Sequence, residues 1–152
     1  MSDPITFESS TPRFAFPLLY AGQAQKEAFV NEAFVRADAL LHCAVDGEAT
    51  TPPENPSDGH AWIVATAASG DWSGNDGMIA YRSGGGWIFI PPCDGTRVFD
   101  RAARQDRLFF GYWRKASMLV EPVGGSTVDG EARAAITNLV ASLQAVGILP
   151  SA

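Results

Sequence analysis

The sequence predicts an α+β protein, with an N-terminal helix, a small antiparallel β barrel or sandwich of five to six short strands, and a C-terminal amphipathic helix. Apolar residues recur at helical spacing near both ends of the 152-residue chain. Between these two regions, short apolar runs alternate with turn sequences rich in Gly, Pro, Asn and Asp. Because the runs lack the long crossovers that parallel strands need, we expect antiparallel pairing.

Three parts follow from this pattern: an arm over residues 1–12, a helix plus antiparallel β domain over residues 13–123, and a linker with the C-terminal helix over residues 124–152. Hydrophobic residues make up 46% of the chain, which is enough for one domain to bury a core. The formal net charge is −6 and the sequence pI is about 4.7. This charge argues against binding to nucleic acid or to an anionic membrane surface.

The N-terminal helix is expected over residues 32–45, with the side chain of Asn31 as its N-cap. Apolar positions at helical spacing support it: Val30, Ala33, Phe34, Ala37, Leu40, Leu41 and Ala44. Residues 21–30 are expected to form either a separate helical turn or an extended lead-in. Residues 13–20, which are apolar and aromatic, suit a strand or an extended segment.

Six short runs are candidates for strands, and they are bounded by proline and glycine. They lie at residues 60–65, 78–82, 87–90, 96–99, 107–113 and 118–123. The second and third runs are joined by Ser-Gly-Gly-Gly at residues 83–86, which predicts a hairpin.

The C-terminal segment predicts an amphipathic helix, capped by Thr127 or Asp129 and ended by Gly147 at the C′ position. Such a helix has three candidate roles: covering its own β domain, packing against copies of itself around a symmetry axis, or docking into a different protein. The flexible break at residues 124–126 favours an intermolecular role. The candidate interface residues are Ile136, Leu139, Val140, Leu143 and Val146.

The sequence shows no constellation typical of an enzyme, a metal site or a cofactor site. His42 and Cys43 are neighbours, and no C-x-x-C or H-x-x-x-H spacing accompanies them or His60. Residues 83–86 lack the pattern of a phosphate-binding loop. The two cysteines, Cys43 and Cys93, are expected to be reduced and partly buried.

The N-terminus has no signal-peptide pattern, and no apolar run approaches the roughly 20 residues that a membrane helix needs. We therefore expect synthesis in the bacterial cytoplasm without membrane insertion.

Aromatic residues in the β region favour a second reading, a carbohydrate-binding module that recognises a host surface polysaccharide. Exposed Trp and Tyr side chains stack on sugar faces. The candidate glycan contacts are Trp72, which lies in a polar glycine-rich turn, together with Tyr81 and Trp113. Trp62 and Trp87 are expected to fill the core.

Several motifs resemble the DUF2793 family of phage tail and gene-transfer-agent proteins. They are A-G-Q-A-Q-K-E at 21–27, V-N-E-A-F at 30–34, D-A-L-L at 38–41, T-P-P-E-N-P-S-D-G at 51–59, W-I-V-A at 62–65, G-D-W-S-G at 70–74 and G-W-I-F-I-P-P at 86–92. The resemblance implies a structural component of a phage-like particle, from a gene transfer agent or prophage. The role it favours is a head-spike base or adaptor that oligomerises and attaches a fibre. It implies as partners a homo-oligomer, capsid or tail proteins, the fibre and a host surface glycan, and it places the chain in the virion.

Overall fold

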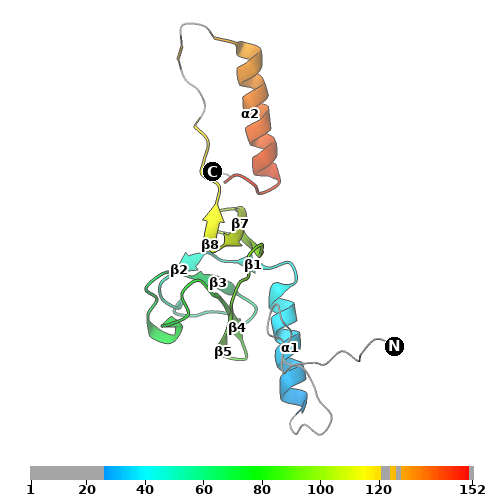
Figure 1. Cartoon of the computed structure of the whole chain (residues 1–152), viewed down its shortest axis with the longest axis vertical. Helices are drawn as coiled ribbons and strands as arrows, with labels where there is room; N and C mark the ends of the chain where they lie inside the picture. Colours follow the sequence, from blue (N-terminus) through cyan, green and yellow to red (C-terminus); the bar gives the residue numbers. More distant parts are fainter. Residues whose placement is uncertain (1–25, 121–123, 126–127, 151–152) are drawn as a thin grey trace, which may run out of the picture.

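A computed structural model describes residues 26–120, 124–125 and 128–150 of the chain. Within these residues it has two α-helices and eight strands, and the strands form two four-stranded sheets (Figure 1). The predicted α+β class is confirmed, with one helix near each end of the chain. Neither sheet closes into a barrel, so the barrel form of the expected fold is wrong. The expected arm (residues 1–12) and the expected segment over residues 13–20 lie outside the described residues.

The first sheet has the strand order β1-β6-β7-β8 and the second has the order β2-β3-β4-β5. The strands are β1 (Ala44–Val45), β2 (Glu48–Ala49), β3 (Ala61–Val64), β4 (Ile79–Ser83), β5 (Gly86–Ile90), β6 (Arg97–Asp100), β7 (Gln105–Phe110) and β8 (Tyr112–Lys115).

Two pairs of strands are parallel, β1 with β6 and β2 with β3, so the expectation of antiparallel pairing throughout is wrong. The chain bends at residues 46–47 and gives one short strand to each sheet. The proline-rich loop over residues 50–60 is the crossover for the β2–β3 pair. For the β1–β6 pair, the whole second sheet is the crossover.

The predicted hairpin is confirmed as β4–β5, with Ser83 paired to Gly86 and Ile79 paired to Ile90. Gly84 and Gly85 both have positive φ angles, of 59° and 75°, as a type I′ turn requires.

The run expected as one strand over residues 107–113 is a second hairpin, β7–β8, which turns at Gly111 with a φ of 69°. Residues 118–120 of the strand expected over 118–123 are not in a strand, and residues 121–123 lie outside the described residues.

The first helix, α1 (Lys26–Leu40), begins before the expected start at residue 32 and ends before the expected end at residue 45. Asn31 lies inside the helix and is exposed, so its assignment as the N-cap is wrong. The helix ends early because His42 has a φ of 52° and Ala44–Val45 pairs with β6 instead. Cys43 consequently lies between the helix and β1.

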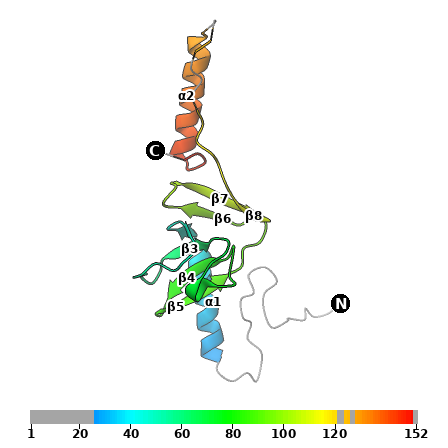
Figure 2. The same ribbon diagram turned by 90° about the vertical axis from the view of Figure 1, so that its left-hand side faces the viewer.

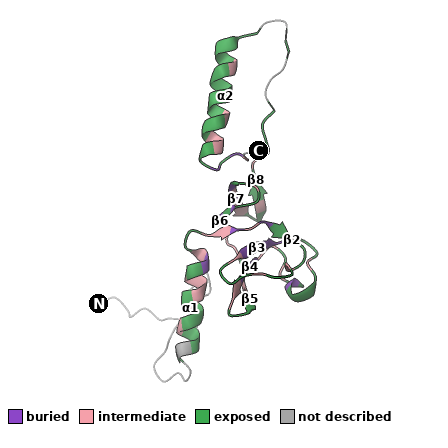
Figure 3. Ribbon diagram, turned by 180° about the vertical axis from the view of Figure 1, so that it is seen from behind, coloured by how far each residue is buried: buried purple, intermediate pink, exposed green. Residues whose placement is uncertain are grey.

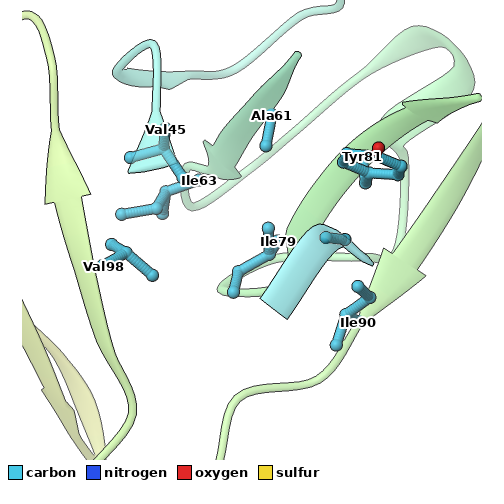
Figure 4. Packing of buried hydrophobic residues seen from close by; sticks show 8 residues of the cluster. Val45, Ala61, Ile63, Ile79, Tyr81, Ile90 and Val98 are labelled. Carbon is cyan, nitrogen blue, oxygen red and sulfur yellow. The ribbon is translucent and has the colours of Figure 1, made fainter. Parts of the chain in front are cut away.

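The main core lies between the two sheets and the C-terminal part of α1. Its buried members are Ala39, Val45, Ala61, Ile63, Ile79, Tyr81, Ile90 and Val98. Figure 4 shows Val45, Ile63 and Val98 pointing toward one another from β1, β3 and β6, so the core joins both sheets. Burial of each Val or Ile side chain stabilises the fold by roughly 1.5–3 kcal/mol.

The second helix, α2 (Gly130–Ala145), starts as predicted, because the Asp129 side chain accepts a hydrogen bond from the backbone N–H of Ala132 at 2.9 Å. Thr127, the other expected cap, lies outside the described residues. The helix ends in a Schellman motif, in which Gly147 N donates to Gln144 O at 3.1 Å and Ile148 N donates to Leu143 O at 2.9 Å. Gly147 has a φ of 71°, which confirms its predicted C′ role.

The two helices lie toward opposite ends of the molecule's long axis, with the sheets between them (Figure 2). Among the described residues, no helix is long and apolar enough to cross a membrane.

Candidate functional site

The apolar face of α2 is open to solvent. No residue of the helix is buried, and Leu139 and Val146 are 59% and 65% exposed (Figure 3). Ile136 is exposed as well, whereas Val140 and Leu143 are half-buried. The first candidate role of this helix, covering its own β domain, is therefore wrong.

The C-terminal end of α2 is attached to the sheets. Asp106 N in β7 donates to Gly147 O at 2.6 Å, and Leu149 is buried. A Cβ atom at Gly147 would lie 3.1 Å from Cε2 of Phe99, so the chain comes very close to β6 here. The helix thus projects away from a fixed base.

The helix α1 buries one side and exposes the other. On its inner side Ala39 is buried in the core, and the Tyr81 hydroxyl donates to Oδ2 of Asp38 at 2.8 Å. Burial, then the hydrogen bond and the charge of Asp38, raise the pKa of Tyr81 to about 12. On the outer side, Phe34 and Leu41 are 67% and 71% exposed. These side chains form a second open apolar surface, far along the chain from α2.

A cleft of about 460 Å³ opens where the two sheets meet. We call it the aromatic cleft, and it is lined by Glu48, Val64, Thr66, Asp76, Gly77, Met78, Pro91, Pro92, Phe109, Gly111, Tyr112 and Trp113. The indole of Trp113 is held in place, because its Nε1–H donates to Gly77 O at 2.9 Å and its ring meets that of Phe109 edge-on at 5.3 Å. The cleft therefore has a fixed aromatic wall.

Two carboxylates in the aromatic cleft are also held in place. Asp76 accepts the backbone N–H groups of Ala67 and Ala68 at 2.8 and 3.1 Å. Oε2 of Glu48 accepts from Nη1 of Arg107 at 2.6 Å. An ionised carboxylate has about four acceptor positions, so both can still accept hydrogen bonds from hydroxyl groups of a ligand. Fixed acceptors beside an aromatic wall suit a polyhydroxylated ligand with an apolar face.

Of the three predicted glycan contacts, only Trp113 lines this cleft. Trp72 is 0% exposed, so its expected exposure is wrong. The short 3₁₀ turn at Gly70–Trp72 folds its ring back onto the second sheet, where it meets Trp87 edge-on at 5.1 Å. Tyr81 is buried on the α1 side. The expectation of core positions for Trp62 and Trp87 is confirmed in part, since both are half-buried against a smaller core cluster.

Sequence reasoning missed Phe109 and the proline pair at 91–92 as cleft residues. The signal for Phe109 was its spacing from Trp113 across a one-glycine turn, which pairs the two residues directly across the β7–β8 hairpin.

His60 contacts an acidic side chain and an aromatic ring. His60 Nδ1 lies 2.5 Å from Oδ2 of Asp46 and its ring stacks on Trp62. Across the described ranges, no group of three or more His, Cys, Asp or Glu side chains is placed to hold a metal ion. Cys43 and Cys93 are not disulfide-bonded, and both are half-buried, as expected. Burial raises the pKa of the Cys43 thiol to about 11.

The architecture defines a class, an α+β protein in which two small sheets share one core and two helices leave apolar faces open. The family model described as "Protein of unknown function (DUF2793)" matches residues 30–114, more than half of the chain. The chain belongs to the DUF2793 family. The match runs from α1 to β8, so α2 and the motif at residues 21–27 lie outside it. A comparison with curated proteins finds no match.

Proposed function

We propose that this chain is a structural component of a phage-like particle, a head-spike base or adaptor that oligomerises and attaches a fibre to the particle. Its partners in this role are copies of itself, a capsid or tail protein and the fibre. It is made in the bacterial cytoplasm and works in the assembled particle. The proposal assigns it no reaction, cofactor or metal.

The observation that carries the proposal is the pair of open apolar surfaces at opposite ends of the long axis, Phe34 and Leu41 on α1 and the face of α2. Large exposed apolar surfaces are typical of protein–protein contacts. Two separate surfaces on opposite sides of one β domain suit an adaptor, which must hold two partners at once. The resemblance of the DUF2793 motifs to phage tail and gene-transfer-agent proteins supports the same role.

The test follows the chain into particles released by a bacterium that carries the gene. A tagged chain is expected to sediment with the particles in a density gradient. Phe34→Asp is expected to lower the particle-bound fraction about tenfold or more, equivalent to about 1.4 kcal/mol of lost binding energy. Asn31→Asp is the matched control, because it adds the same charge at another exposed position of α1. Sedimentation of the tagged chain apart from the particles would reject the proposal.

The aromatic cleft favours a second function, carbohydrate binding. Its support is the fixed Trp113 ring beside the carboxylates of Glu48 and Asp76. Screening against surface polysaccharides, followed by titration, tests it. Trp113→Ala is expected to weaken binding about tenfold or more, whereas Trp87→Ala, away from the cleft, is expected to leave it unchanged. No binding to any polysaccharide, or equal binding by both variants, would remove this function from the cleft.

A further inference from the structure

We propose that the α2 helices of more than two copies of this chain pack side by side, parallel and in register, as a coiled-coil bundle. The inference rests on the proposed function, which supplies the particle in which the bundle forms. It identifies the partner of the α2 face as the same helix of another copy. Four features of the described residues carry it: the spacing of the apolar side chains, the absence of charge, the small flanking residues and the fixed end of the helix.

Four apolar residues of α2 and its C-cap, of which Leu143 is half-buried and the others are exposed, have the spacing of a coiled coil. Ile136, Leu139, Leu143 and Val146 are separated by three, four and three residues. They therefore occupy successive a, d, a and d positions of a heptad, and Ala132 occupies the preceding d position. Side chains in this arrangement insert between those of another helix with the same repeat.

The absence of charge indicates that the other helix is an identical one. No Asp, Glu, Lys or Arg occurs between Ala134 and Pro150. The whole chain carries a net charge of −6, so copies repel one another over most of their surfaces. Because the α2 face is uncharged, identical copies can make contact there without burying like charges. A strongly charged partner would instead bury unpaired charge against it.

The residues beside the a/d positions point to more than two helices. In a two-stranded coil the flanking e and g positions commonly carry charged pairs. Here Val140 occupies one e position and the small residues Ala135 and Ser142 occupy g, while Arg133, at the e position of the first turn, is the one charged flanking residue from Ala132 to Val146. The apolar face is wider than a two-helix contact can cover, so a bundle of three or more helices buries it better.

The attachment of α2 to its own β domain, combined with cyclic symmetry, makes the helices parallel. Its C-terminal end is tied to β6 and β7 by the hydrogen bond from Asp106 N to Gly147 O and by the buried Leu149. Closed rings of more than two copies have cyclic or dihedral symmetry, and around a single axis all copies point the same way. All β domains then lie at one end of the bundle, as a base requires. Two heptads are too short to assemble by themselves, so the full chain is the object to test.

The first experiment measures the mass of the full chain in solution. We expect a closed assembly of three or more copies. Leu139→Asp is expected to reduce it to a monomer, while Ala141→Asp is expected to leave it intact. Ala141 is also exposed but lies at the outer f position, and the two variants add the same charge to the same helix. A monomer at about 1 mM chain, a dimer, or equal effects of both variants would overturn the inference.

The second experiment tests direction and register in a Cys43→Ser, Cys93→Ser background. Identical d residues meet in a parallel, in-register bundle, so Leu139→Cys is expected to form disulfide-linked pairs under mild oxidation. Ala141→Cys is expected to stay unlinked. Cross-linking of Ile136→Cys chains with Val146→Cys chains, without Leu139→Cys pairs, would indicate antiparallel packing and overturn the inference.

These outcomes separate the inference from the proposed function. An intact bundle that is absent from purified particles rejects the particle role and leaves the bundle standing. A particle-bound chain whose mass and cross-links are those of a monomer rejects the bundle and the self-assembly part of the proposed function, and leaves the attachment to the particle standing.

Discussion

Arg107 of β7 donates from Nη1 to Oε2 of Glu48 in β2 at 2.6 Å, and this ion pair joins the two sheets. The same guanidinium donates from Nε to Oδ2 of the buried Asp100 at 2.6 Å. Burial alone would lower the pKa of Arg107, but its hydrogen bonds and ion pairs with Glu48 and Asp100 outweigh burial and raise it. One cation therefore pairs with two carboxylates, and one of these, Glu48, lines the aromatic cleft.

Arg107→Met is expected to lower the free energy of unfolding by about 3–5 kcal/mol, because it leaves the buried Asp100 carboxylate unpaired. Chemical denaturation of the purified variant measures it. Arg101→Met is the control: it breaks an exposed pair with Asp46 and is expected to cost less than about 1 kcal/mol. Equal costs for the two variants would show that the buried cation adds nothing beyond a surface pair.

Tyr81 makes the attachment of α1 sensitive to alkaline pH. Its pKa is raised from 10.0 to about 12 in the folded chain. The folded state then keeps a proton that the unfolded state releases, so this contribution to stability is complete below about pH 10 and is lost as the pH rises toward about 12. Tyr81→Phe is expected to flatten this loss and, at neutral pH, to cost about 0.5–1.5 kcal/mol for the hydrogen bond to Asp38.

The measurement is a series of denaturation curves across that pH range. Cys43 loses its own contribution as the pH rises from 9.0 toward about 11, so both proteins should carry Cys43→Ser. If the free energy of unfolding falls equally steeply with alkaline pH in the Tyr81→Phe protein, another group causes the loss of stability.

Gly147 holds the base of α2 against β6. Its φ of 71° strains any side chain, and a Cβ would approach Cε2 of Phe99 to 3.1 Å. Gly147→Ala is expected to cost about 1–2 kcal/mol for the backbone strain alone, and to loosen the contact with Asp106. The rate of hydrogen exchange at the Asp106 amide measures how often its hydrogen bond to Gly147 O opens. Gly74→Ala is the control, because Gly74 has a φ of 79° and no neighbour within 4 Å. Faster exchange in both variants, or in neither, would contradict this role.

Local patterns predicted most elements, and long-range pairing explains the errors. The Gly84–Gly85 hairpin and the caps of α2 at Asp129 and Gly147 depend on neighbouring residues, so the sequence predicted them correctly. The two-residue strand Ala44–Val45 is chosen by a partner more than 50 residues away, and nothing in its own sequence distinguishes it from the end of a helix.

The candidate site shows the same division. The heptad positions of α2 can be read from spacing, and three of them, Ile136, Leu139 and Val146, are exposed. The aromatic cleft could not be predicted, because it forms where two sheets meet. The predicted exposure of Trp72 was wrong because a polar, glycine-rich turn normally exposes its side chains, whereas here the turn folds back over Val64 and Ala80.

Because Trp72 is fully buried, it stabilises the fold and does not contact a ligand. Trp72→Ala is expected to cost about 3–5 kcal/mol, because it empties a fully buried site. Trp72→Phe is expected to cost much less than its lost volume suggests, since the Nε1–H has no hydrogen-bond partner among the described residues and its removal relieves an unsatisfied donor. Denaturation curves of the two variants measure this difference, with the half-buried Trp87→Ala as control, expected to cost less than Trp72→Ala. Equal costs for Trp72→Ala and Trp72→Phe would contradict the expected gain from removing the unsatisfied donor.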